Sequence, residues 1–108
     1  MEADLGRYTD AALLVLVSLA DAPKHALAVQ ADVKMLSGQD LGPGTLYAVI
    51  GRLESRQMIA RVPGTDPRVK YRITDHGALT LRAQLDAMHR VAQAGLGRLA
   101  SARSRTSA

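Results

Sequence analysis

Residues 41–59 read LGPGTLYAVIGRLESRQMI, and residues 61–74 continue the chain as RVPGTDPRVKYRIT. Pro43 suits the first position of a helix, where its missing N–H costs nothing, and Gly42 then stands at the N-cap. One face of this helix carries apolar side chains at helical spacing: Leu46, Val49, Ile50 and Leu53. The stretch therefore predicts a short amphipathic helix that packs one face into a core.

The opposite face of this helix has small residues in its middle and larger polar ones on its flanks. It carries Gly44, Tyr47, Ala48, Gly51, Arg52 and Ser55. Such a profile suits a helix that must approach base pairs closely. The alternative is a short surface helix of weak propensity, because Gly51 costs about 1 kcal/mol relative to alanine.

Two strands are expected directly after this helix, at residues 59–62 and 69–74, joined by a turn at residues 64–67. The second strand alternates apolar with polar side chains: Val69, Tyr71 and Ile73 against Lys70, Arg72 and Thr74. This pattern predicts one buried and one solvated face. The cations should then project from one side of a hairpin beside the helix, which is how a winged helix-turn-helix is written in sequence.

The charge distribution changes sign at the helix that Pro43 opens. The 108-residue chain has a net charge of +4, yet residues 1–44 hold three basic and six acidic side chains. Residues 45–72 hold six basic against two acidic, and residues 73–108 hold five against two. A basic stripe is typical of phosphate binding. Taken alone, it is explained equally well by a solvated surface that happens to be basic.

Three more helices complete the expected fold. The first spans residues 10–20, with Thr9 or Asp10 as its N-cap, and is apolar on nearly all sides. The second spans residues 24–36. The last runs from Asp75 to about residue 100 and carries apolar side chains close to a heptad spacing: Ala78, Leu81, Leu85, Met88, Ala92, Leu96 and Leu99.

Packing of the last helix against a second copy of the chain is the expectation, because a helix of this length projects beyond so small a domain. Intramolecular packing is the alternative. One side of the first helix should face the second subunit too, since a helix apolar on all sides is buried on all sides. The expected dimer interface comprises Leu13, Leu16, Leu81, Leu85, Met88, Ala92, Leu96 and Leu99.

The predicted fold is mostly α with a small β-hairpin. A winged helix-turn-helix domain is expected at residues 1–74, a dimerisation helix at 75–100 and a disordered polar tail at 101–108. The chain has no Cys, which removes disulfides and thiolate chemistry and fits a reducing cytoplasm. The apolar run at 11–20 is too short to span a bilayer, and no signal peptide is expected.

Catalysis is not expected. His25, His76 and His89 stand on separate segments or thirteen residues apart, so no helical metal pair forms. Ser37 and Ser55 have no evident base. His25 is interpreted as a packed or hydrogen-bonded side chain rather than a ligand, and neither a cofactor nor a metal is predicted.

The order of elements and the motifs together resemble the PadR family of bacterial transcriptional regulators. The matching segments are PGTLY at 43–47, RLE at 52–54 and PRVKYRIT at 67–74, together with Gly77 and His25. The resemblance covers roughly Leu13 to the end of the last helix. It implies a homodimeric winged helix protein, usually a repressor of pseudo-palindromic operators, often released by a small molecule. The short C-terminal part resembles the compact branch of the family.

Carried over by motif, the resemblance implies that Thr45, Tyr47 and Arg52 contact DNA from the helix. The wing contributes Arg68, Lys70 and Arg72. The exposed profile of the helix adds Ala48 and Ser55 as expected contacts to double-stranded DNA, and the basic side chain of Arg56 is expected to neutralise a phosphate. Arg52 is expected to bind either a guanine or a phosphate.

The chain departs from the family at two positions that are often basic, where it has Ala48 and Gly51. Without Trp or Phe, it also lacks the side chains that stack planar drugs in some relatives. A hydrophobic or aromatic effector remains a possible partner. Two other readings stay open: a sensor dominated by a small molecule, and a winged helix for protein contacts with weak, non-specific DNA binding.

Overall fold

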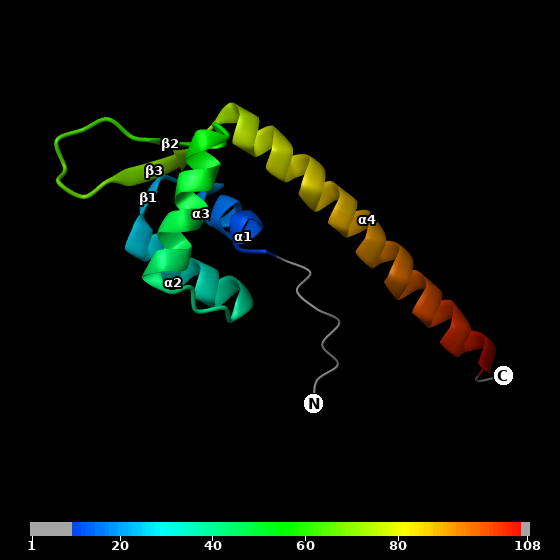
Figure 1. Cartoon of the computed structure of the whole chain (residues 1–108). Coiled ribbons are helices and arrows are strands. Elements are labelled where there is room, and N and C mark those ends of the chain that lie inside the picture. Colours follow the sequence, from blue (N-terminus) through cyan, green and yellow to red (C-terminus); the bar gives the residue numbers. More distant parts are fainter. Residues whose placement is uncertain (1–9, 107–108) are drawn as a thin grey trace.

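The computed structural model describes residues 10–106, which form a small helical domain with a long helical arm (Figure 1). The elements in chain order are α1 (Ala11–Leu19), β1 (Lys24–His25), α2 (Ala26–Ser37), α3 (Pro43–Ser55), β2 (Ile59–Arg61), β3 (Lys70–Ile73) and α4 (Asp75–Thr106). We call residues 10–81 the head and residues 82–106 the arm. The radius of gyration is 17.4 Å, against about 13 Å for a compact chain of this length.

Helix α1 lies at the centre of the head and contacts α2, α3, α4 and β3. Asp10 is its N-cap, because its Oδ1 accepts a 2.9 Å hydrogen bond from the Leu13 amide; Thr9 lies outside the described residues. Leu16 is only 5% exposed and Leu13 packs partly buried against the same core. The chain itself therefore covers most of Leu16, although both residues line an open hollow; their contact with a second subunit stays a prediction.

The sheet has three strands in the order β1-β3-β2, all antiparallel, rather than the two-stranded hairpin expected. Strand β1 pairs Lys24 with Tyr71 and His25 with Lys70. Two residues are too few to show the alternation that marks a strand, so the sequence predicts this segment as part of the following helix. That helix, α2, begins at Ala26 instead.

Lys24, the first residue of β1, forms hydrogen bonds to the end of α1 and to the segment that follows it. Its Nζ donates to the Ser18 carbonyl and, at 2.6 Å, to Asp21. The Lys24 ammonium lowers the pKa of the Asp21 carboxyl through this hydrogen bond and its charge. This cation therefore stabilises the turn between α1 and β1.

A tight joint connects the end of α3 to the start of α4. Gln57 adopts a left-handed conformation, with φ of 60°, and the Met58 amide bonds back to the Leu53 carbonyl at 2.9 Å. Thr74 Oγ1 donates to the Gln57 carbonyl at 2.7 Å and accepts from the Gly77 amide at 3.0 Å. A Cβ added at Gly77 would overlap the Met58 carbonyl oxygen. The joint therefore requires glycine there and fixes α4 to the head.

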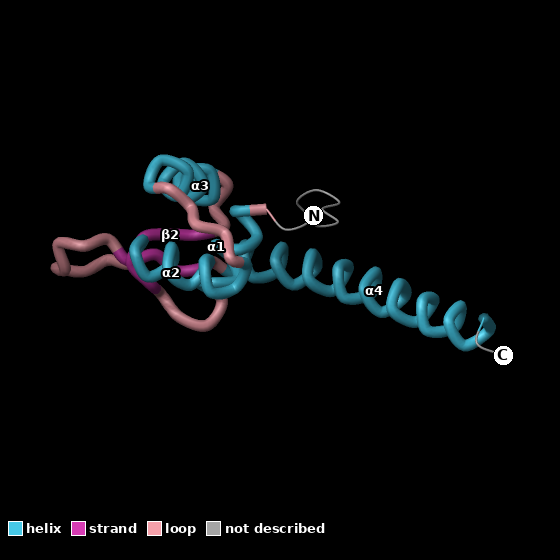
Figure 2. Tube along the Cα trace, turned by 90° about the horizontal axis from the view of Figure 1, so that it is seen from below, coloured by secondary structure: helices cyan, strands magenta, loops and turns pink. Residues whose placement is uncertain are grey.

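The arm extends away from the head on the side opposite the hairpin loop, as both views show (Figures 1 and 2). Helix α4 continues to Thr106, so the expected end at residue 100 and the disordered tail at 101–108 are wrong for residues 101–106. Ala102, Arg103 and Arg105 are good helix formers, and basic residues in a last turn complement the helix dipole. Residues 107–108 lie outside the described part of the chain.

Candidate nucleic-acid interface

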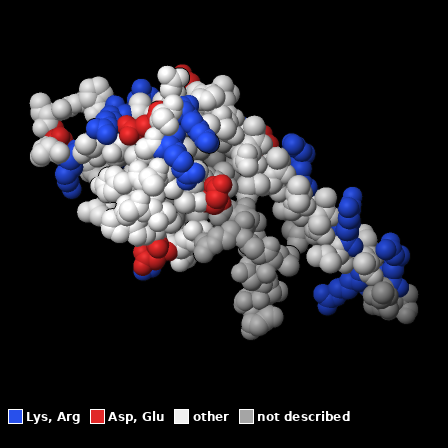
Figure 3. Space-filling view, viewed as in Figure 1, with Lys and Arg blue, Asp and Glu red and all other residues white. Residues whose placement is uncertain are grey.

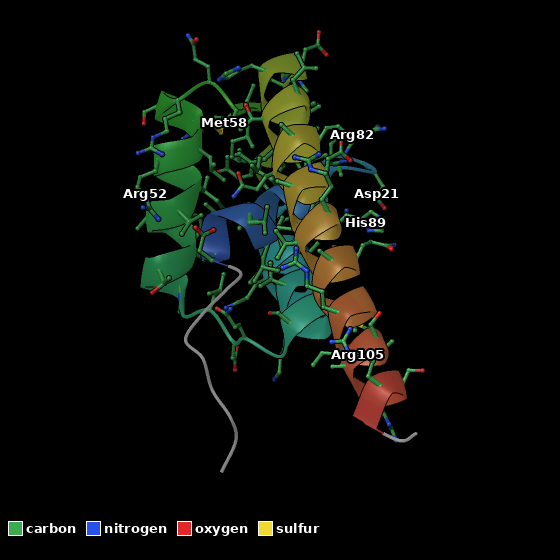
Figure 4. The ribbon with its side chains drawn as sticks, turned by 90° about the vertical axis from the view of Figure 1, so that its right-hand side faces the viewer. Asp21, Arg52, Met58, Arg82, His89 and Arg105 are labelled. Atoms are coloured by element: carbon green, nitrogen blue, oxygen red, sulfur yellow. The ribbon has the colours of Figure 1, made fainter. Side chains whose placement is uncertain are left out.

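Helix α3 has the two faces that its sequence predicts. Gly42 is the N-cap and Pro43 occupies the first turn. The apolar face is buried in the head: Leu46, Val49, Ile50 and Leu53. The opposite face is exposed along its length: Gly44, Thr45, Tyr47, Ala48, Gly51, Arg52 and Ser55. Arg52 projects from α3 on the side away from α4 (Figure 4).

The hairpin carries its cations outward as expected. Lys70 and Arg72 are exposed on β3, whereas Tyr71 between them is buried, and that burial raises the pKa of its hydroxyl. Val69 departs from the predicted alternation, because it is 40% exposed. It precedes β3, and with Leu27 and Tyr47 it lines an open hollow of about 310 Å³ instead of entering the core.

The basic side chains of α3 and the hairpin fall into two groups: those that form an ion pair with an acidic residue and those that do not. Glu54 Oε2 accepts a 3.0 Å hydrogen bond from Arg61 Nε, which raises the pKa of Arg61 and neutralises its charge. Arg68 lies 4.0 Å from Asp66. The other four basic residues that are predicted to contact DNA form no ion pair within residues 10–106: Arg52, Arg56, Lys70 and Arg72. These four charges are available to an external anion.

Most of the predicted DNA contacts lie on one surface. In Figure 3 basic side chains gather over α3 and the adjoining hairpin. Ser55 is exposed there, but its hydroxyl donates to the Arg52 carbonyl at 3.0 Å. Arg56 differs from the others, because it borders a hollow of about 190 Å³ between α1, α3 and α4.

His25 adds a contact to this surface that the sequence did not reveal. Its Nδ1 lies 3.1 Å from the Val69 carbonyl oxygen and its Nε2 lies 3.5 Å from Asp66 Oδ2. The interpretation of His25 as a hydrogen-bonded side chain is confirmed. Its partners in the hairpin follow 41 and 44 residues later in the chain, so only knowledge of the β1–β3 register could have identified them.

The predicted dimer residues divide between the head and the arm. Leu81 is 5% exposed and packs mainly within its own head, so little of its surface is left for a partner. Farther along α4, Leu85 is 38% exposed and Met88 is partly buried. The rest of the seam is open to solvent: Ala92, Leu96 and Leu99.

An apolar groove of about 640 Å³ runs beside this seam on α4. It is lined by Ala83, Gln84, Ala87, Met88, Val91 and Ala92. Among residues 10–106, no cluster of three or more His, Asp or Glu could hold a metal ion. No helix in that range is long and apolar enough to cross a membrane.

A short α2–turn–α3 unit, an outward basic helix and a hairpin wing define a winged helix DNA-binding domain. Comparison with known proteins agrees. The model of the Transcriptional regulator PadR-like family matches residues 15–83. The chain therefore belongs to this family of transcriptional regulators.

Individual relatives support the same assignment. A PadR family transcriptional regulator from Eggerthella lenta DSM 2243 is 31% identical, with a TM-score of 0.63 over 82% of this chain and 79% of that one. The PadR-like regulator BC4206 from Bacillus cereus ATCC 14579 is 15% identical and shares the fold, with a TM-score of 0.71 over 82% and 89%.

A relative of greater length also matches. An uncharacterized 37.1 kDa protein in transposon TN4556 of Streptomyces fradiae is 35% identical over 85 residues. The match covers 79% of this chain and 25% of that protein. The chain therefore spans about a quarter of the length of this relative.

Proposed function

We propose that the protein is a homodimeric repressor that binds a pseudo-palindromic operator with α3 in the major groove and the hairpin on flanking phosphates. The observation that supports this proposal is that Arg52, Lys70 and Arg72 form no ion pair and are exposed on α3 and the hairpin, while the apolar seam of the arm is uncovered within residues 10–106. A two-fold dimer presents two reading helices to half-sites about one helical turn apart.

Phosphate neutralisation supplies most of the affinity in this proposal. Each contact releases counterions and adds about 0.9 to the slope of log affinity against log salt. Arg56, Arg68, Lys70 and Arg72 are the proposed phosphate contacts, with Arg56 reaching DNA from the C-terminal end of α3. Such contacts position the head without reading sequence.

Sequence reading falls to the exposed face of α3. Arg52 is free of acidic partners and projects outward, so it can bind a guanine edge or a phosphate, and a bidentate guanine contact is worth about 1–3 kcal/mol of discrimination. Ala48 offers an apolar contact to a thymine methyl. Thr45, Tyr47 and Ser55 complete the proposed face. Because few polar groups are available, DNA shape contributes to specificity.

Dimerisation through α4 is the second part of the proposal. Leu85, Leu96 and Leu99 leave apolar area exposed, and burial of a leucine side chain is worth about 1.5–3 kcal/mol. The adjoining groove allows close approach of a partner helix at its three alanines, Ala83, Ala87 and Ala92. A second copy of α4 provides the matching surface.

Release by a small hydrophobic or aromatic molecule is the third part. The hollow of about 190 Å³ touches α1, α3 and α4 together, including Leu53, Met58 and Leu81. A ligand there would contact both the reading helix and the root of the arm. Hydrophobic cations and phenolic acids that bind the folded state should raise its melting temperature in a thermal-shift screen.

Selection of bound duplexes from a random pool tests the main proposal. We expect enrichment of a palindromic site, with affinity that falls steeply as salt rises. Weak binding without sequence preference would contradict the repressor assignment and favour a winged helix used for protein contacts. Binding that is tight but to a single, non-palindromic site would contradict the dimeric arrangement.

A further inference from the structure

His25 connects the body of the head to the loop of the wing. Residues 63–69 are exposed, and within residues 10–106 the polar side-chain contacts of this loop to another element are those with His25. One ring nitrogen faces the Val69 carbonyl oxygen at 3.1 Å, and the other faces Asp66 Oδ2 at 3.5 Å. The imidazole itself is four-fifths buried.

Both partners of the ring are hydrogen-bond acceptors. A neutral imidazole has one N–H and one lone pair, so it can donate to only one of them and turns a lone pair toward the other. The imidazolium carries an N–H on each nitrogen and can donate to both. The geometry of the wing therefore suits the protonated form of His25.

The neighbouring charged groups act in opposite directions: the Asp66 carboxylate favours the imidazolium, whereas the cations Arg68 and Lys70 disfavour it. Asp66 accepts a 3.0 Å hydrogen bond from the Arg68 amide, and this bond, with the nearby cations, lowers the pKa of its carboxyl. Lys70 stands opposite His25 in the β1–β3 register. The other titratable residues near His25 are Tyr47 of α3, the buried Tyr71 of β3, and Lys24, whose ammonium donates a hydrogen bond to Asp21.

We propose that His25 is a positioning residue for the wing, whose imidazolium fixes the loop through Val69 and Asp66 and strengthens DNA binding. The inference rests on the proposed use of the wing on DNA. Histidine changes charge between pH 5 and 8. The protonated form makes both contacts, so the wing is anchored at the acid end of this range and loosens as the pH rises.

Nuclear magnetic resonance of the full chain tests the anchor without DNA. Between pH 5.5 and 8, the amide resonances of residues 66–70 should move in step with the His25 ring signals. His25→Ala should abolish this movement, whereas His76→Gln and His89→Gln, which alter exposed histidines of α4, should leave it intact. Wing resonances that do not follow the His25 ring would overturn the proposal.

Binding to the selected duplex then tests the consequence. Loss of a charge-assisted contact in His25→Ala should weaken binding about tenfold at pH 6 and much less at pH 8. His25→Asn keeps an N–H for the Val69 carbonyl, so it should fold and bind while losing the dependence on pH. Equal pH dependence in wild type and His25→Ala would overturn the proposal.

Asp66→Asn separates the anchor from the simple effect of a positive charge near DNA. The asparagine Oδ1 can still accept from the Arg68 amide, but it no longer attracts the imidazolium. The anchor predicts a reduced pH dependence in this variant, and full retention would show that charge alone is responsible. If wild type bound no DNA at any pH, the proposed function would fail while the resonance experiment would still decide the anchor.

Discussion

The head and the arm both carry regularly spaced apolar side chains on their helices, but these side chains are buried in the head and exposed in the arm. In the head, Val15, Val29 and Val33 are fully buried, and α1 packs against α2, α3 and α4 of its own chain. In the arm, Val91, Leu96 and Leu99 are between 69% and 73% exposed. An apolar spacing on a helix therefore indicates that a face will be covered, but the surrounding chain decides what covers it.

Length explains the difference. Helix α4 has 32 residues, and its first two turns suffice to seat Leu81 in the core. The rest passes beyond the edge of the head. A long exposed helix gains little stability from propensity alone, and most helices depend on packing of an apolar face. The proposed second copy supplies that packing.

Leu85→Lys should produce the largest change, because it places a charge in the proposed seam twice per dimer. Burying an unpaired ammonium is strongly unfavourable, and we expect the dimer dissociation constant to rise more than about 100-fold. Operator binding should be lost with it. Sedimentation measures the first effect and band shift the second.

Leu79→Lys is the matched control for that substitution. Leu79 also lies on α4 and is 72% exposed, but it stands outside the heptad seam. This variant should remain dimeric. An intact dimer in Leu85→Lys would remove the seam assignment, and dissociation of both variants would show that charge on any face of α4 is disruptive.

Gly77→Ala should destabilise the head by about 3 kcal/mol, because the new Cβ meets backbone rather than a movable side chain. Urea unfolding measures the effect. Gly97→Ala is the control in the arm, where nothing lies within 4 Å of the added Cβ. It should stabilise the helix by about 1 kcal/mol. Similar stabilities for the two variants would contradict the described joint.

Lys70→Ala and Arg52→Ala should weaken DNA binding in different ways. The lysine variant should lose affinity similarly on all sequences, with the salt slope reduced by about 0.9. The arginine variant should lose discrimination at one operator position if Arg52 reads a base, and behave like the lysine variant if it binds a phosphate. Unchanged binding in both would exclude the proposed DNA surface.

Ser18→Ala should have the smallest effect. Ser18 is 1% exposed, and its Oγ has no hydrogen-bond partner within residues 10–106. Removing an unsatisfied buried hydroxyl is neutral or stabilising by up to about 1 kcal/mol. Thermal unfolding measures the stability of the variant relative to wild type. A clear loss of stability would mean that the Ser18 hydroxyl is hydrogen-bonded in solution.

The sequence predicted the elements whose signals are local. The period of Leu46, Val49, Ile50 and Leu53, and the proline before them, located α3 and its exposed face. The alternation around Tyr71 located β3. Asp10 is one of the two expected N-caps of α1, and its side chain makes the expected hydrogen bond.

Features that depend on distant parts of the chain were missed. Strand β1 is defined by pairing with Lys70 and Tyr71 rather than by its own two residues. Leu81 follows the same heptad as Leu85, yet only the folded head shows that it is internal. The link from His25 to the wing requires the same long-range register. The polar composition near the C-terminus predicts a tail, whereas the helix propensity of its alanine and arginine residues agrees with the observed helix.

Sedimentation of the full chain, alone and with the selected duplex, tests most directly whether the arm pairs two heads. Pairing of two heads by the arm predicts a dimer in the absence of DNA and two chains on each duplex. A monomer that binds the duplex one to one with undiminished affinity would contradict it.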